Sequence, residues 1–204
     1  FSDAIYGIED DGRYVTESRL KKMLSHEVEL IEQRLKRDKH PNKMFFSYAN
    51  TVATIDFAKQ FKGHGWVGIK YQVEPDEDYN EIILHIRFKE TDARLQQETL
   101  GILGVNLIYG AYYKYNDPKK LLRYLYDHLD KDQLEIDTIN FSGPRFANVD
   151  NRLMSLQLVK NGMTDAVMFG PDGKNVLPAS ILYKKNILAL RGSFRPVTQV
   201  NMDM

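Results

Sequence analysis

Two short loops contain the residue types that bind anions. One runs from Asn140 to Arg145 and the other from Gly170 to Lys174, and each contains a Gly-Pro step. Each follows an apolar stretch that we expect to be a strand, and ligands of open α/β sheets bind beyond the carboxyl ends of parallel strands. Arginine side chains offer fixed cationic forks to anionic oxygens. The candidate ligand-binding residues are Asn140, Ser142, Gly143, Arg145, Asn148, Arg152, Gly170, Asp172, Arg191 and Arg195. Ordinary loops with surface arginines are the alternative interpretation.

A β-hairpin is the clearest element in the sequence. Residues 66–73 and 80–88 alternate between apolar and polar side chains. Pairing Val73 with Asn80 gathers the apolar side chains of both strands on one face, and a slip by one residue would destroy that separation.

The polar face of this hairpin is the second candidate site. It carries Trp66, Glu81, His85 and Arg87. The predicted pairing sets Trp66 opposite Arg87, in position for a cation–π contact, and Gly68 opposite His85. A solvated sheet face is the alternative, because one histidine and one glutamate are too few to hold a metal.

Several motifs lack the context that their chemistry requires. The stretch 63–68 matches G-x-G-x-x-G, but it precedes a strand instead of a helix, so we interpret it as a glycine-rich strand entry. His26 and Glu27 begin a zinc motif that Leu30 breaks. The acidic residues 74–78 lack EF-hand spacing, which indicates a solvated turn. The sequence therefore predicts no metal site and identifies no cofactor.

The elements around these candidates predict a mixed α/β fold. An antiparallel hairpin is followed by helices and then by a parallel strand–helix–strand unit with a right-handed crossover. The predicted helices begin after Thr16, after Thr91 or Asp92, at Asp117-Pro118, and at Asn148 or Asp150; the further predicted strands are 44–49, 134–141, 165–169, 187–190 and 197–203.

Composition limits the functional classes. The 204 residues include 28 basic and 28 acidic side chains, and this zero net charge argues against a nucleic-acid partner. The absence of cysteine excludes disulfides and thiolate chemistry. The longest uncharged stretch, 99–113, falls short of the ~20 residues of a membrane span. We expect a cytoplasmic protein with no membrane partner and some tendency to form a homo-oligomer. Phe1 in place of an initiator methionine predicts that residues 1–204 are a single α/β domain from a longer chain.

Four runs resemble a family of longer, uncharacterised bacterial proteins. They are residues 103–111, 151–159, 168–173 and 191–198, and the resemblance extends from about Tyr14 to the end of the chain. Members of this family are named either TonB-dependent receptor or nicotinate-nucleotide adenylyltransferase.

The sequence allows a physical test of both names. An outer-membrane receptor of about 22 spanning strands, each of about ten residues, needs roughly 220 residues in strands alone, so this chain is not such a receptor. The adenylyltransferase motif is of the H-x-G-H type, which the residues from His64 to Val67 do not match.

The leading hypothesis is a domain that binds a small anionic metabolite or a nucleotide. A non-catalytic interaction or oligomerisation domain is the first alternative. A nucleotidyltransferase-like enzyme, as the family name implies, is the second; whether the chain is an enzyme stays open, because no pair of nucleophile and base is visible in the sequence.

Overall fold

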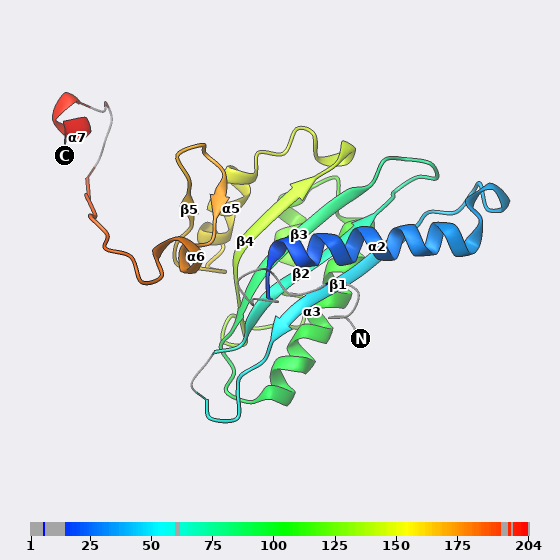
Figure 1. Ribbon diagram of the computed structural model, residues 1–204, viewed down its shortest axis with the longest axis horizontal. Coiled ribbons are helices and arrows are strands. Elements are labelled where there is room, and N and C mark those ends of the chain that lie inside the picture. Colours follow the sequence, from blue (N-terminus) through cyan, green and yellow to red (C-terminus); the bar gives the residue numbers. More distant parts are fainter. Residues whose placement is uncertain (1–5, 7–14, 60–61, 193–195, 197, 204) are drawn as a thin grey trace.

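The computed structural model describes residue 6 and residues 15–59, 62–192, 196 and 198–203. Its centre is a four-stranded sheet in the order β1-β2-β3-β4, in which every neighbouring pair is antiparallel (Figure 1). The strands are β1 (Phe46–Ala53), β2 (His64–Tyr71), β3 (Asn80–Phe88) and β4 (Leu134–Ser142). The fold is mixed α/β, as the sequence predicts.

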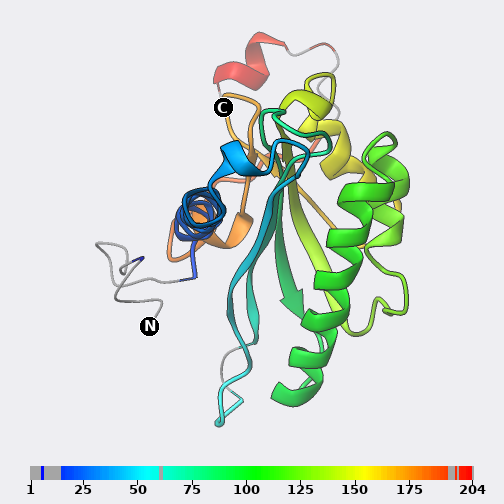
Figure 2. The same ribbon diagram turned by 90° about the vertical axis from the view of Figure 1, so that its right-hand side faces the viewer.

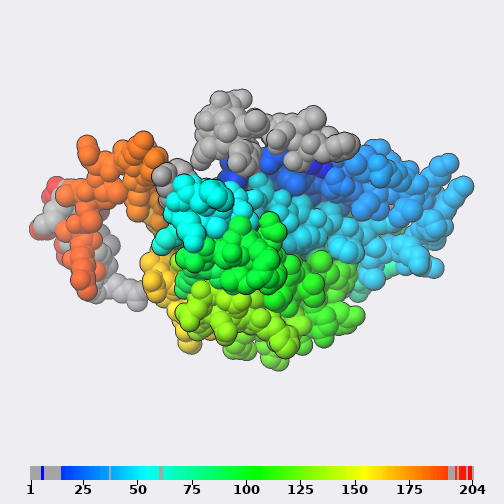
Figure 3. Space-filling view, turned by 90° about the horizontal axis from the view of Figure 1, so that it is seen from below, coloured from blue at the N-terminus to red at the C-terminus, as the bar shows by residue number. Residues whose placement is uncertain are grey.

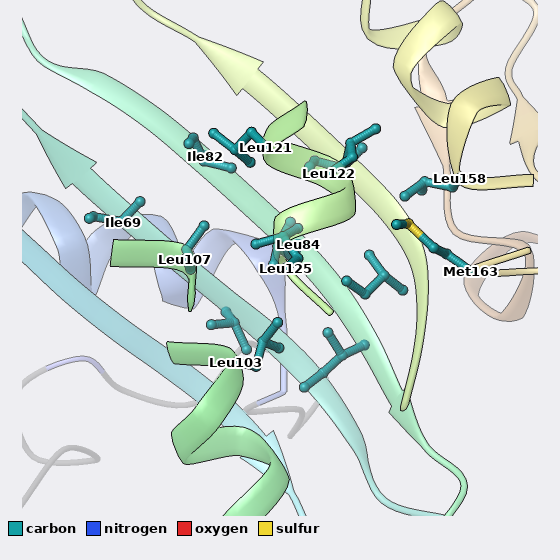
Figure 4. Packing of buried hydrophobic residues seen from close by; sticks show 14 of the residues in the cluster. Ile69, Ile82, Leu84, Leu103, Leu107, Leu121, Leu122, Leu125, Leu158 and Met163 are labelled. Carbon is teal, nitrogen blue, oxygen red and sulfur yellow. The ribbon is translucent and has the colours of Figure 1, made fainter. Parts of the chain in front are cut away.

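Three helices cover one face of this sheet (Figure 2). They are α3 (Ala93–Tyr113), α4 (Pro118–Tyr124) and α5 (Asn151–Lys160). The alternating apolar side chains of the strands meet the apolar sides of these helices, and each buried aliphatic side chain contributes about 1.5–3 kcal/mol. The fully buried members of this cluster include Ile69, Ile82, Leu84, Leu103, Leu107, Leu121, Leu122, Leu125 and Leu158 (Figure 4). The predicted apolar face of the hairpin is thereby confirmed.

The long helix α3 is fixed by polar contacts at two places. Asp92 caps its first turn by accepting hydrogen bonds from the amides of Arg94 and Leu95. The buried Asn106 side chain donates to the carbonyl oxygens of Leu125 (3.1 Å) and Asp127 (2.7 Å), which ties α3 to the chain after α4. Among the described residues, neither α3 nor any other helix combines the length and apolar character of a membrane span.

The helix α2 (Glu17–Leu35) packs against part of the other face (Figure 2). Thr16 caps it, as predicted, and Leu20 and Leu24 are buried against the sheet. A Cβ atom added at Gly68 would lie 3.0 Å from Leu24 Cδ1 and 3.1 Å from Leu20 Cδ2, so glycine permits this close approach. The buried Ser47 hydroxyl donates to the Leu24 carbonyl (2.8 Å). The interpretation of the polar face as wholly solvated is therefore wrong.

The register of the β2–β3 hairpin differs by two residues from the prediction. Tyr71, instead of Val73, pairs with Asn80. The reason lies in the connecting loop, where Glu77 accepts hydrogen bonds from the amides of Val73 (3.0 Å) and Glu74 (3.2 Å) and withdraws both from the ladder. A shift of two keeps every side chain on its predicted face but changes its partner. Trp66 consequently lies opposite His85, and His64 lies opposite Arg87.

The predicted parallel strand–helix–strand unit is not found in the described residues. The strand after α5 shortens to β5 (Met168–Phe169), which pairs antiparallel with β6 (Asn175–Val176). A tight turn at Gly173, whose φ is +75°, joins the two strands, so β5 pairs with β6 instead of β4. Figure 2 shows this small hairpin on the α2 side of the sheet.

The C-terminal strands predicted from the sequence are also wrong. After the short helix α6 (Pro178–Leu182), residues 187–190 form no regular structure. Helix α7 (Gln199–Asp203) occupies most of the stretch 197–203, and residue 197 lies outside the described residues. The 3-10 turns η1 (Arg37–Lys39) and η2 (Pro144–Phe146) complete the elements of the described chain.

Truncation of Leu24 tests the packing of α2 on the sheet. We expect Leu24→Ala to lower the free energy of unfolding by about 2–5 kcal/mol, because Leu24 is fully buried. Lys22→Ala changes an exposed residue of the same helix and should alter it by less than about 0.5 kcal/mol. Urea unfolding measures both, and equal effects would contradict this packing.

Replacement of Glu77 tests the contact that sets the hairpin register. Although burial raises the pKa of Glu77, hydrogen bonds from Arg145 and the loop amides outweigh it and hold the pKa below its ordinary 4.5. The ionised carboxylate therefore stabilises the fold above about pH 4.5, and this contribution is lost as the pH falls through the folded-state pKa.

We expect Glu77→Gln to lower the urea midpoint at pH 7, and the gap from the wild type to narrow toward pH 3. The matched control Asp78→Asn changes an exposed carboxylate of the same loop and should leave the midpoint nearly unchanged. A gap that stays constant with pH would show that the charge of Glu77 is not responsible.

Candidate functional site

The described residues form a cavity of about 920 Å³ on the polar face of the sheet. Its floor is made by β2, β3 and β4, and its walls are the first turn of α2 and the stretch 175–183. We call it the sheet-face cavity. It arises because α2 covers this face only in part, while the β5–β6 hairpin and α6 cover the side toward β4 (Figure 2).

A chain of three side chains leads from the sheet interior to this cavity. His85 Nδ1 lies 2.7 Å from Asp137 Oδ1, and both residues are buried, with exposures of 2% and 7%. His85 Nε2 lies 3.3 Å from Nδ1 of His64, which is exposed at the cavity wall. The Trp66 ring packs edge-on against His85, with ring centroids 4.9 Å apart. The order Asp137–His85–His64 thus runs from buried to accessible.

A β-bulge supplies the buried carboxylate of this chain. His85 pairs with Thr138 and the next residue, Ile86, pairs with Ile136, so Asp137 is an extra residue in β4. A bulge of this kind re-aims side chains locally. Ile136 and Ile139 both remain in the core. Because two residues instead of one separate them, Asp137 can reach His85 on the polar face.

With both imidazoles neutral, the hydrogen bonds allow one placement of the ring protons. A carboxylate only accepts, so His85 Nδ1 donates to Asp137, and the Nε2 atom of neutral His85 is left as an acceptor. His64 Nδ1 then donates to His85 Nε2, and His64 Nε2 keeps its lone pair. Partial removal from water lowers the pKa of His64 below its ordinary 6.5, and positive charge on His85 or Arg87 acts in the same direction, against the opposite effect of the Asp137 carboxylate.

Cationic side chains lie beside this chain. Lys62 and Arg87 both line the sheet-face cavity, and the Arg87 side chain is 51% exposed. Arg87 Nη1 lies 4.0 Å from Asp137 Oδ2, at the limit of an ion pair. The acidic residue Glu17 at the cavity wall is paired with Lys21 at 2.7 Å. Among the described residues, the cavity lining therefore carries positive charge that its acidic side chains do not fully compensate.

Neutral polar groups complete the lining on the β4 side. Thr138 and Asn140 of β4 and Asn175 of β6 lie there, and Asn175 Nδ2 donates to Asn140 Oδ1 (3.1 Å) and to the Ile139 carbonyl (3.2 Å). These contacts hold the β5–β6 hairpin to the main sheet. Asn140 is the one residue of the first predicted set in the cavity lining.

The central arginine of the first predicted set has a structural partner. Arg145 binds Glu77 through Nε and lies 3.0 Å from Glu74 through Nη2. Its backbone amide donates to Asn80 Oδ1 (2.8 Å). Arg145 therefore joins the loop after β4 to the β2–β3 loop, and its charge is paired with the carboxylates of Glu74 and Glu77.

The other members of the first predicted set do not form one site. Arg152 pairs with Asp150 (2.9 Å), and Asp172 Oδ1 accepts the amide of Lys174 (3.0 Å) in the turn that begins at Gly170. Ser142, Asn148 and Arg191 are exposed, and Gly143 shapes its loop with a φ of +105°. Arg195 lies outside the described residues.

The second predicted set lies closer to the cavity. Trp66, His85 and Arg87 all line it, whereas Glu81 pairs with Lys70 at 3.4 Å on the same sheet face. The sequence reasoning missed Lys62, His64, Asp137 and Asn175.

Signals for two of the missed residues exist in the sequence. His64 lies two residues before Trp66 and so shares its face. Asp137 lies where the apolar spacing of β4 changes from two to three, since Leu134, Ile136, Ile139 and Phe141 are the core residues. Lys62 and Asn175 lie in segments whose path the sequence did not predict.

The described residues contain no cluster of three or more histidine or acidic side chains that could hold a metal ion. The sheet-face cavity has cationic side chains and an imidazole at its wall.

Comparisons of the chain with protein-family models, with curated proteins and with solved structures found no match.

Proposed function

We propose that this chain binds a small anionic metabolite or a nucleotide in the sheet-face cavity. The observation that carries the proposal is the pair of cations, Lys62 and Arg87, at the wall of a concave site of about 920 Å³. That volume is in the range of small-molecule sites. The proposed ligand class is the one expected from the sequence, but the site moves from the Gly-Pro loops to the polar face of the sheet.

The cavity lining also suits the neutral part of such a ligand. Trp66 and Leu177 offer apolar surface, while Thr138 and Asn140 offer a hydroxyl and an amide. Fixed polar groups of this kind orient a ligand, and the cations supply charge-assisted hydrogen bonds to its anionic oxygens. The glycines of the stretch 63–68 lie at the start of β2 and on it, so the proposal uses side-chain cations instead of a phosphate loop at a helix N-terminus.

Fluorescence titration tests this proposal, because Trp66 is the only tryptophan in the chain. The probes are inorganic phosphate, malonate and adenosine monophosphate. We expect a saturable change in Trp66 emission with at least one of them. Arg87→Gln and Lys62→Gln should each weaken that binding by about tenfold or more, because a hydrogen bond to a charged group is lost.

Lys119→Gln is the matched control, since it removes an exposed lysine of α4, on the opposite side of the sheet. It should leave the affinity unchanged. Emission that stays flat with all three probes at millimolar concentrations, or affinity that survives in the Arg87→Gln, Lys62→Gln double variant, would refute binding in this cavity.

The second candidate, an interaction domain, is supported by the C-terminal stretch 184–190. It extends away from the body of the protein (Figure 3) and exposes Ile187 (56%) and Leu188 (85%) among other large apolar side chains. Exposed apolar surface of this kind often marks an interaction site. Sedimentation velocity over a range of concentrations tests it. A self-associating chain that becomes monomeric on Leu188→Ser would favour this candidate, and a monomer at all concentrations would remove self-association.

A further inference from the structure

The proposed binding site uses the cations of the sheet-face cavity but leaves its most ordered polar feature unused. Burial of a histidine–aspartate pair is costly unless both partners are hydrogen-bonded, and here they are, at 2.7 Å. The pair adjoins the apolar cluster of Leu20, Leu24, Trp66 and Ile83 on the same face. His85 in turn contacts His64, the more exposed of the two histidines among the described residues that line the cavity.

We infer that the sheet-face cavity is a hydrolytic centre in which His64 Nε2 acts as a general base toward water, with His85 and Asp137 as positioning residues. Asp137 fixes His85 with its proton on Nδ1, and His85 in turn fixes His64 with its proton on Nδ1. The remaining lone pair of His64 is on the nitrogen away from this chain. A general base that another side chain holds in one tautomer activates oxygen nucleophiles in unrelated enzymes, and here His85, fixed by Asp137, would hold the base.

The charges of the cavity indicate the substrate class, and this step rests on the proposed function. Lys62 and Arg87 would hold an anionic group, which leaves an ester bond of the same molecule to be placed near His64. The inferred substrate is therefore a small ester that also carries a carboxylate or a phosphate.

The inferred reaction balances without a redox partner. The oxygen of a water molecule forms a bond to the acyl carbon while one of its protons passes to His64 Nε2. The carbon–oxygen bond to the leaving group then breaks, and His64 returns the proton to the departing alkoxide. The products are an acid and an alcohol. While His64 carries the proton, its positive charge lies next to His85 and, through it, the Asp137 carboxylate.

Two p-nitrophenyl esters test the inference with the protein as it is. p-Nitrophenyl acetate is neutral, and mono-p-nitrophenyl succinate carries a carboxylate. We expect the chain to hydrolyse both, with a higher kcat/KM for the succinate ester. His64→Gln, a change at an exposed residue, should reduce the hydrolysis of both esters by about a hundredfold, in the range of general-base catalysis. The control His128→Gln changes an exposed histidine far along the chain and should have no effect.

The pH dependence separates a positioning role from a structural one. In the part of the chain that the structure describes, the charged and titratable groups around His64 are His85 and Arg87 of β3, Asp137 of β4, Glu17 of α2, Lys62 and Tyr183. The rate should rise with pH to a plateau, with a midpoint below 6.5, as His64 loses its proton. Asp137→Asn should lower both the plateau and the midpoint, because the carboxylate raises the pKa of His64.

A second measurement needs no substitution and so does not depend on the folding of a variant. Diethyl pyrocarbonate acylates the free lone pair of a neutral imidazole, and mass spectrometry locates the product. Below pH 6.5 a larger share of His64 than of an ordinary imidazole is neutral, because its pKa is lowered. In that range His64 should react faster than the exposed His40 and His128, and the buried His85 should not react.

The outcomes test general-base catalysis by His64 separately from anion binding by Lys62 and Arg87. Equal hydrolysis by the wild type and His64→Gln, or His64 no more reactive than His40, would overturn the general base. A smaller ratio of kcat/KM for the succinate ester to kcat/KM for the acetate ester in Arg87→Gln than in the wild type supports the anion site and the base together. An absence of that preference in the wild type, with His64-dependent hydrolysis present, would overturn the proposed anion binding and keep the base.

Discussion

The hydrogen bond between His85 and Asp137 is the constraint on which the rest of the site depends. Two polar side chains with exposures of 2% and 7% need hydrogen-bond partners within the protein, and each supplies one for the other. Their bond fixes the orientation of the His85 ring, and the oriented ring presents its Nε2 atom to His64 Nδ1. The cations beside it lie on exposed side chains and can adapt to a ligand, whereas this pair cannot move without breaking the bond.

The fold supplies this bond through three local features. The extra residue of β4 allows Asp137 to reach the polar face, and the two-residue difference in the β2–β3 register sets Trp66, instead of Gly68, opposite His85. Partial coverage by α2 on one side and by the β5–β6 hairpin on the other then leaves a cavity above the pair (Figure 2). Glu77 and Arg145, far from His64 along the strands, contribute by fixing the loop that sets the register.

The sequence predicts the layers of this fold better than its site. Alternation identified the hairpin faces, and caps such as Thr16 and Asp92 located helix starts, because both signals are local. The cavity depends on features that local sequence patterns do not determine. They are the hydrogen-bonded loop that shifts the β2–β3 register, the bulge in β4, and the pairing of β5 with β6 instead of β4. Arg145 illustrates the limit, since its acidic partners lie about seventy residues earlier in the chain. Of the residues that the sequence analysis missed, His64 could have been found from its shared face with Trp66, and Asp137 from the change of apolar spacing in β4.

The tautomers of the two imidazoles in solution show whether Asp137 and His85 hold His64 with an unprotonated Nε2. Nitrogen-15 NMR of histidine-labelled protein distinguishes a protonated ring nitrogen from a bare one for each residue. At pH 7 we expect His85 and His64 both to carry their ring proton on Nδ1, with an unprotonated Nε2 on His64. A neutral His64 ring protonated on Nε2 at that pH would contradict this arrangement, because its lone pair would then be on Nδ1, against His85.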